Sequence, residues 1–157
     1  MRLFETSAIT RYIDETFDGP ALQPSDAIAR ARMDQWISAF NCYYDPLLVR
    51  VLILERLVAP MRGKETDRAR IDEALPEIDD RLGVLERELG DGRAYIVGEE
   101  LTLADLFFAP AIAYLRMTPE SERLLANRSA IGRWFDMVSA RPSFAATQPS
   151  LPDAEAA

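Results

Sequence analysis

The stretch GEELTLADLFFAPAIAYL, residues 98–115, carries the strongest local signal in this chain of 157 residues. Thr102 and Asp105 stand three residues apart, directly before an apolar run, which is the spacing of a capping box at the start of a helix. The helix that follows is apolar almost all round, and this indicates a central, buried helix. A carboxylate at the mouth of such a helix could also serve as a general base. Because the capping geometry already accounts for it, we interpret Thr102 and Asp105 as a structural capping box.

Helical periodicity also dominates on the N-terminal side of this stretch. Long helices are predicted over residues 26–56 and 65–89. Pro46 predicts a kink or local break in the first helix, Pro76 predicts an interruption of the second, and Gly90 is placed as a C-terminal cap. The only segment with strand character is the short AYIVG. We therefore predict an all-α helical bundle.

Composition and charge exclude several classes of function. The net charge is −8, from 26 acidic and 18 basic residues, and no Lys/Arg cluster is present, so nucleic acid is not an expected partner. The chain has no histidine, which excludes Ser-His and Cys-His nucleophile pairs and the common histidine metal sites. We therefore predict no metal site. The single cysteine, Cys42, lies in an aromatic-rich run on a predicted helix, and we interpret it as a buried structural thiol.

Hydropathy predicts no membrane partner. No segment approaches the ~20 apolar residues of a membrane-spanning helix. The most apolar run, PLLVRVLILERLV at residues 46–58, contains Arg50, Glu55 and Arg56. Charged residues near the N-terminus also interrupt any signal-peptide core. A cytoplasmic protein is the expectation.

Three stretches together resemble one known family. YIVGEELTLADLFFAPAI, residues 95–112, resembles the core-helix motif of the glutathione S-transferase C-terminal domain, in which a glycine precedes a Ser/Thr-x-x-Asp box. RARMDQWI is similar to the family's fourth helix, and the YYDP that follows resembles a proline-containing stretch of bacterial and phi-like members. IGRWFDMVSARPSF, residues 131–144, resembles the closing helices. The resemblance covers nearly the whole chain and implies the helical bundle of that domain.

The N-terminal stretch FETSAITRYI, residues 4–13, resembles the last helix of the family's thioredoxin-like N-terminal domain. In the family a Glu-Ser pair at this place holds the γ-glutamyl end of glutathione, and the pair maps to Glu5 and Thr6. The free amides at a helix N-terminus suit such a carboxylate, although the residues alone favour an ordinary N-cap at Thr6. The domain organisation implied by the resemblance is a remnant helix at 1–18, a linker at 19–25, the helical domain at 26–148 and a disordered tail at 149–157.

The pocket for an electrophilic substrate is mostly a feature of the C-terminal domain in this family. Phe40, Asn41 and Tyr44 are predicted to lie one turn apart on one helix face, where they could line such a pocket. Tyr114 and Met117, near the end of the core helix, are further candidates. Core packing is the alternative for Phe40, whereas a polar Asn41 on an apolar face is expected to have a partner or to face a cavity.

The resemblance implies a truncated glutathione S-transferase whose parent activity is conjugation of glutathione to electrophiles. The family's thiol-activating residue belongs to the thioredoxin-like domain, which is largely absent from this sequence, so we assign no catalytic residue and expect the isolated chain to be inactive. Glutathione is then a co-substrate and not a resident cofactor, and self-association is expected. The alternatives are a non-catalytic helical interaction module and one half of a split transferase.

Overall fold

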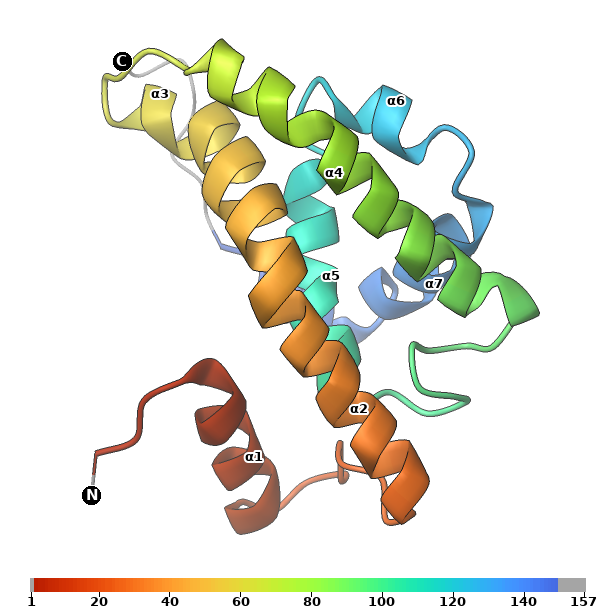
Figure 1. Ribbon diagram of the computed structural model, residues 1–157. Coiled ribbons are helices and arrows are strands. Elements are labelled where there is room, and N and C mark those ends of the chain that lie inside the picture. The colour runs from red at the N-terminus through yellow and green to blue at the C-terminus, as the bar shows by residue number, and fades with distance from the viewer. Residues whose placement is uncertain (1, 150–157) are drawn as a thin grey trace.

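Helices make up most of residues 2–149, the part of the chain that the computed structural model describes (Figure 1). In chain order the elements are α1 (Thr6–Thr16), α2 (Ala27–Ala39), η1 (Phe40–Val58), α3 (Ala59–Met61), α4 (Arg68–Glu88), η2 (Leu89–Asp91), α5 (Leu103–Leu115), α6 (Ser121–Leu125), α7 (Ser129–Ser139) and α8 (Pro142–Ala146). Within the described range no strand is present, and the segment AYIVG forms only an isolated bridge between Tyr95 and Gly98. The predicted all-α bundle is confirmed. Residues 150–157 of the predicted tail lie outside the described residues.

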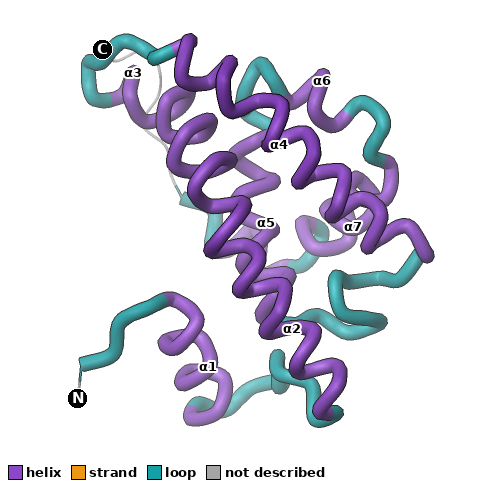
Figure 2. The backbone as a smooth tube through the Cα atoms, in the orientation of Figure 1, coloured by secondary structure: helices purple, strands orange, loops and turns teal. Residues whose placement is uncertain are grey.

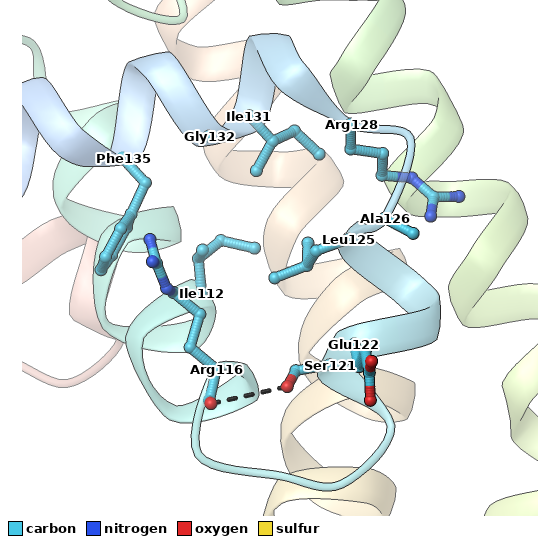
Figure 3. A pocket seen from close by; sticks show the side chains of 10 residues that line it. All are labelled: Ile112, Arg116, Ser121, Glu122, Leu125, Ala126, Arg128, Ile131, Gly132 and Phe135. Carbon is cyan, nitrogen blue, oxygen red and sulfur yellow. Dashed lines mark hydrogen bonds between the residues drawn. The ribbon is translucent and has the colours of Figure 1, made fainter.

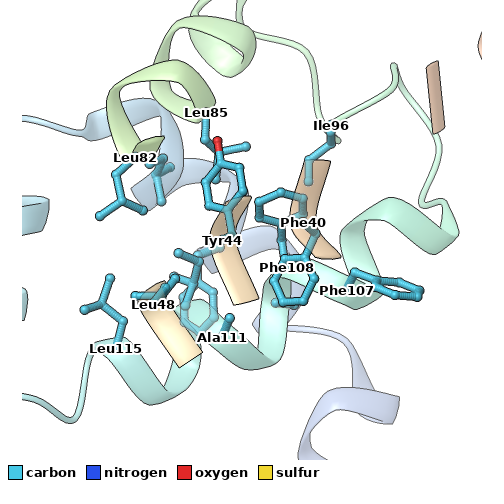
Figure 4. Packing of buried hydrophobic residues seen from close by; sticks show 14 of the residues in the cluster. Phe40, Tyr44, Leu48, Leu82, Leu85, Ile96, Phe107, Phe108, Ala111 and Leu115 are labelled. Atoms are coloured by element: carbon cyan, nitrogen blue, oxygen red, sulfur yellow. The ribbon is translucent and has the colours of Figure 1, made fainter. Parts of the chain in front are cut away.

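The core of the bundle surrounds α5. This helix packs against α2, η1 and α7, and its Phe108 is fully buried. The Phe108 ring makes edge-on contacts with Phe40 at 5.0 Å and with Tyr44 at 4.8 Å between ring centroids (Figure 4). Such T-shaped pairs stabilise a core by about 0.5–1.5 kcal/mol beyond the area that they bury. One stripe of α5 nevertheless faces outward, through Leu106 and Pro110.

The two proline positions do not break their helices. α2, η1 and α3 form one continuous helix from Ala27 to Met61, and α4 continues through Pro76. In η1, which contains Pro46, the helix has wider, π-type turns; the Ala59 N–H donates to the carbonyl of Leu54, five residues earlier. The predicted interruption at Pro76 is therefore wrong, and at Pro46 the helix does not break but has these wider turns. Both prolines are exposed while the opposite helix faces pack into the core, so tertiary packing outweighs one lost hydrogen bond.

The end of α4 also differs from the prediction. The helix tightens into the 3₁₀ turn η2, and the left-handed residue that ends it is Gly92, with φ of 89°. Gly90 was expected to be the cap, but it lies inside this extra turn. The physical reason is that the helix continues for one tight turn before the chain reverses, and a residue with positive φ is needed only at the reversal.

The helix Ala27–Met61 is long and apolar enough to cross a membrane by length and composition. This does not contradict the prediction of no membrane partner, because length and composition alone are weak evidence for a membrane span. Core helices of globular bundles can have the same length and apolar composition. In this chain the helix supplies Trp36, Phe40, Tyr44 and Leu52 to the buried core.

α1 stands to one side of the bundle (Figures 1 and 2), and none of its residues is buried. Polar contacts hold it there. Arg11 forms an ion pair with Asp34 of α2, and the Asp14 carboxylate accepts a hydrogen bond from the Leu22 amide at 2.7 Å. The Leu22 carbonyl in turn accepts from the amide of Leu103, at the start of α5, at 3.1 Å. The position of α1 thus depends on charges and on the connecting segment rather than on apolar burial.

Candidate functional site

The backbone of Glu5 is strained. Among residues 2–149 it is the one non-glycine residue with positive φ, at φ 70° and ψ 120°, and its side chain is exposed. A residue with a β-carbon adopts this conformation at a cost, and such strain gathers at functional sites. Glu5 directly precedes α1, so the strained residue stands at a helix N-terminus.

The N-terminus of α1 has no side-chain cap. Glu5 occupies the N-cap position and its carbonyl accepts from the amides of Ala8 and Ile9, each at 3.0 Å, but no side chain bonds to the first amides of the helix. Thr6 is the first helical residue and therefore not the N-cap, which removes the alternative interpretation of Thr6 as an ordinary cap. The first amides of a helix have no partner within it and carry partial positive charge. Together with the exposed Glu5 carboxylate and Thr6 hydroxyl, they can accommodate a ligand that bears both a carboxylate and an ammonium group.

Phe40, Asn41 and Tyr44 do not share one face. Phe40 and Tyr44 are buried in the aromatic core, whereas Asn41 is exposed. The predicted shared face is wrong for Asn41, which lies with the exposed Cys42 and Tyr43 on the outward side of the helix. The Tyr44 hydroxyl donates to the Arg81 carbonyl at 2.8 Å, and burial raises the pKa of this phenol to about 12. Tyr44 therefore has its partner inside the bundle.

The other candidates are also separated. Tyr114 packs partly buried against the core, and the Met117 side chain is 53% exposed just beyond the end of α5. Cys42 is exposed, so its interpretation as a buried structural thiol is wrong. Its aromatic neighbours suggested burial, but Cys42 lies on the outward side of the helix, as Asn41 does. The five pocket candidates thus divide between buried, partly buried and exposed positions.

Asp105 is a fully buried junction between three segments of the chain. Both halves of the capping box with Thr102 are present, and Oδ2 accepts from the Thr102 amide at 2.8 Å and from its hydroxyl at 3.0 Å. Oδ1 accepts from the Ile96 amide at 2.9 Å and from Trp134 Nε1 at 2.8 Å. Burial raises the pKa of the Asp105 carboxyl, although these four hydrogen bonds oppose the shift. Because every bond is internal and no surface is exposed, Asp105 has no route to a substrate.

The structure shows partners of Asp105 that the sequence analysis missed. Ile96 and Trp134 are nine and 29 residues away from it in the chain. The only available signal for Trp134 was its place in the stretch that resembles the closing helices. Within the described part of the chain, no group of three or more His, Cys, Asp or Glu side chains could hold a metal ion.

These features agree with the resemblance found in the sequence: a helical bundle surrounds an apolar core helix, the buried Thr102–Asp105 box bonds to Trp134, and α1 lies apart from the bundle. The family model described as "Glutathione S-transferase, C-terminal domain" matches residues 49–142. The chain belongs to the glutathione S-transferase family.

Individual relatives agree with this assignment. Glutathione S-transferase F14 of Arabidopsis thaliana is 32% identical over 151 residues, which are 94% of this chain and 59% of the relative. A glutathione S-transferase of Hyoscyamus muticus is 34% identical over 146 residues, 92% of this chain and 68% of the relative. Among solved structures, glutathione S-transferase I from maize in complex with an atrazine glutathione conjugate superposes with a TM-score of 0.81 at 28% identity, covering 96% of this chain and 71% of that one. The chain thus spans less than two thirds of the length of the Arabidopsis relative.

Proposed function

We propose that this chain is the helical part of an enzyme that conjugates glutathione to electrophiles, and that Glu5 and Thr6 bind the γ-glutamyl end of the tripeptide. The observation that carries the proposal is the N-terminus of α1, where a strained, exposed Glu5 precedes an uncapped helix. The proposal also treats residues 19–25 as a linker between α1 and the helical bundle. The proposal also includes a cytoplasmic location.

The chemistry of the γ-glutamyl end matches this helix terminus. That end of glutathione carries a carboxylate and an ammonium group on one carbon. The carboxylate is stabilised by the free amides and partial positive charge at the start of α1, and the Thr6 hydroxyl can add one hydrogen bond. The Glu5 carboxylate supplies the opposite charge for the ammonium group. Uncapped amides and an exposed acidic side chain are thus both needed, and both are present.

Activation of the thiol requires groups that the described residues do not provide near α1. A donor must stand close to the sulfur to stabilise the thiolate. Tyr44 is buried with a pKa of about 12, and its hydroxyl is already bonded to the Arg81 carbonyl. We therefore propose that the chain by itself binds glutathione weakly and does not accelerate conjugation. A thioredoxin-like part, in the same polypeptide or in another, supplies the missing donor.

A fusion tests the proposal. A thioredoxin-like domain of this family, placed ahead of Met1, is expected to give conjugation of glutathione to an activated aryl chloride, while the 157-residue chain alone gives the uncatalysed rate. In the fusion, Thr6→Ala is expected to raise the KM for glutathione more than it lowers kcat, because Thr6 binds ground state and transition state alike.

Thr16→Ala is the matched control, since Thr16 lies exposed at the opposite end of the same helix. If Thr6→Ala and Thr16→Ala change the KM for glutathione equally, Thr6 does not belong to the glutathione site. Catalytic turnover by the unfused chain would contradict the proposal that a thioredoxin-like part supplies the thiol-activating donor.

A role in protein association is the second candidate, and exposed apolar side chains favour it. Phe4, Ile9, Ile13 and Phe17, in and beside α1, are 79%, 37%, 48% and 65% exposed. Apolar surface of this extent, on and beside one short helix, marks an interaction face. In this proposal α1 contacts a second copy of the chain, or the partner half of a split transferase, through the face formed by these residues.

A further inference from the structure

A cavity of about 340 Å³ lies between α5, α6 and α7 (Figure 3). Its apolar walls come from three different helices, through Ile112, Leu125, Ile131 and Phe135. Figure 1 shows α6 and α1 at opposite ends of the molecule, so the cavity is separate from the N-terminus of α1. Its size is that of a pocket for a small molecule.

Gly132 keeps part of this cavity open. It lies in the middle of α7, where glycine destabilises a helix relative to alanine. Neither backbone conformation nor close packing requires a glycine here, since its φ is not positive and a β-carbon added to it would meet nothing within 4 Å. The effect of the missing side chain is therefore space beside Ile131 and Phe135 in the cavity wall.

Arg116 provides a cationic group at the same cavity. Its guanidinium carbon lies 4.9 Å from the centre of the Phe135 ring. Within residues 2–149 its side chain makes no hydrogen bond, and its one ion-pair contact is with Asp136 at 3.6 Å, where the Asp136 side chain is 76% exposed. A contact so long and so well solvated is weak, so the donors of Arg116 remain available to an anion.

The second arginine at the cavity is already occupied. Arg128 donates to the carbonyl of Leu124 and to both the carbonyl and the carboxylate of Asp79. It therefore forms part of the wall. Glu122 stands exposed among the lining residues, and its negative charge disfavours a ligand with more than one negative charge.

We infer that this cavity binds a small aromatic monocarboxylate, with the ring against Ile112, Ile131 and Phe135 and the carboxylate on Arg116. The apolar walls provide burial for one or two fused rings, and a guanidinium binds a carboxylate through two parallel hydrogen bonds. This site does not depend on the proposed function, because none of its residues belongs to α1.

The test is titration of the 157-residue chain with naphthoate, followed by amide chemical shifts in NMR spectra. We expect saturable shifts at Gly132 and Ser121, and much weaker binding of the uncharged naphthamide. Arg116→Gln is expected to weaken naphthoate binding about tenfold, because one charge-assisted contact is lost. Gly132→Leu is expected to abolish binding by filling the cavity, whereas Gly132→Ala raises the melting temperature and leaves room for the ring.

Arg133→Gln is the matched control, since Arg133 lies exposed on α7 and does not line the cavity. If Gly132→Leu does not fold, the naphthoate affinities of Arg116→Gln and Arg133→Gln still test the inference. Both side chains are exposed, so neither substitution is expected to prevent folding. Absence of shifts at millimolar naphthoate, shifts confined to α1, or equal affinities for naphthoate and naphthamide would each overturn the inference.

Discussion

At the scale of single residues, Asp105 holds three segments together through one carboxylate. Its two oxygens serve different regions: Oδ2 bonds to Thr102 beside it, and Oδ1 bonds to Ile96 and Trp134. Burying an ionised carboxylate is costly unless all its hydrogen bonds are made. Asp105 meets this condition, since four donors surround it.

Asp105→Ala is expected to lower the free energy of unfolding by about 3 kcal/mol, because it leaves buried N–H and O–H groups without an acceptor. Asp105→Asn is expected to cost less, since one oxygen remains to accept from Ile96 or Trp134 while the new amide group faces the Thr102 N–H. Denaturant unfolding measures both. Asp80→Ala is the control, an exposed position on α4 that is expected to change stability by less than about 0.5 kcal/mol. If Asp105→Ala and the control unfold at the same denaturant midpoint, Asp105 does not stabilise the fold.

The local half of this junction could be predicted from the sequence, and the other half could not. Thr102 and Asp105 are three residues apart, so a capping box can be recognised from spacing alone. Trp134 is 29 residues further along, and no periodicity in the sequence encodes a contact across that distance. Contacts between distant segments also decide the positions of Asn41 and Cys42. Their helix was predicted correctly, but the side of it that faces the core depends on where α5 packs.

At the scale of whole elements, α7 receives its N-terminal cap from another helix. No side chain of its own caps α7, but Glu86 on α4 accepts from the amides of Ala130 and Ile131, both at 2.9 Å. A carboxylate at a helix N-terminus satisfies free amides and interacts favourably with the helix dipole. Glu86 therefore fixes α7 against α4 as well as starting it.

Glu86→Gln is expected to lower the free energy of unfolding by about 1 kcal/mol, since it removes the charge and one of the two acceptor oxygens. Thermal unfolding followed by circular dichroism measures the change. Glu77→Gln is the matched control on the same helix, where the exposed pair with Arg81 contributes little. If the two variants melt together, the cap from α4 does not stabilise α7.

The number and order of the long helices followed from apolar periodicity, but proline positions misled the prediction. Pro46 and Pro76 lie on exposed positions of helices whose other faces are buried. The rule that proline interrupts a helix considers the lost hydrogen bond and the steric clash of the ring. It does not count the apolar burial on both sides of the proline, which keeps the helix continuous.

At the scale of the whole molecule, α1 is joined to the bundle by polar contacts while its apolar side chains remain exposed. We expect the 157-residue chain to associate through this face as its concentration rises from micromolar to millimolar. Sedimentation velocity measures the shift in mass. Ile13→Glu on α1 is expected to restore the monomer, because a charge in an apolar interface is costly.

Ile28→Glu is the control for this substitution, since Ile28 is 73% exposed on α2 and lies outside the α1 face. A chain that stays monomeric throughout the concentration range would argue against self-association. Equal effects of the two substitutions would place the contact elsewhere on the surface.

The two oxygens of Asp105 also imply an order of events during folding. The bond to the Thr102 amide closes a separation of three residues and can form as soon as α5 nucleates, whereas the bond from Trp134 closes one of 29 residues and waits for α7. Before α7 docks, Oδ1 lacks its Trp134 partner, so we expect the start of α5 to remain accessible to solvent. We therefore expect solvent to be excluded from Asp105 in the same cooperative step in which α7 docks and Trp134 bonds to Oδ1.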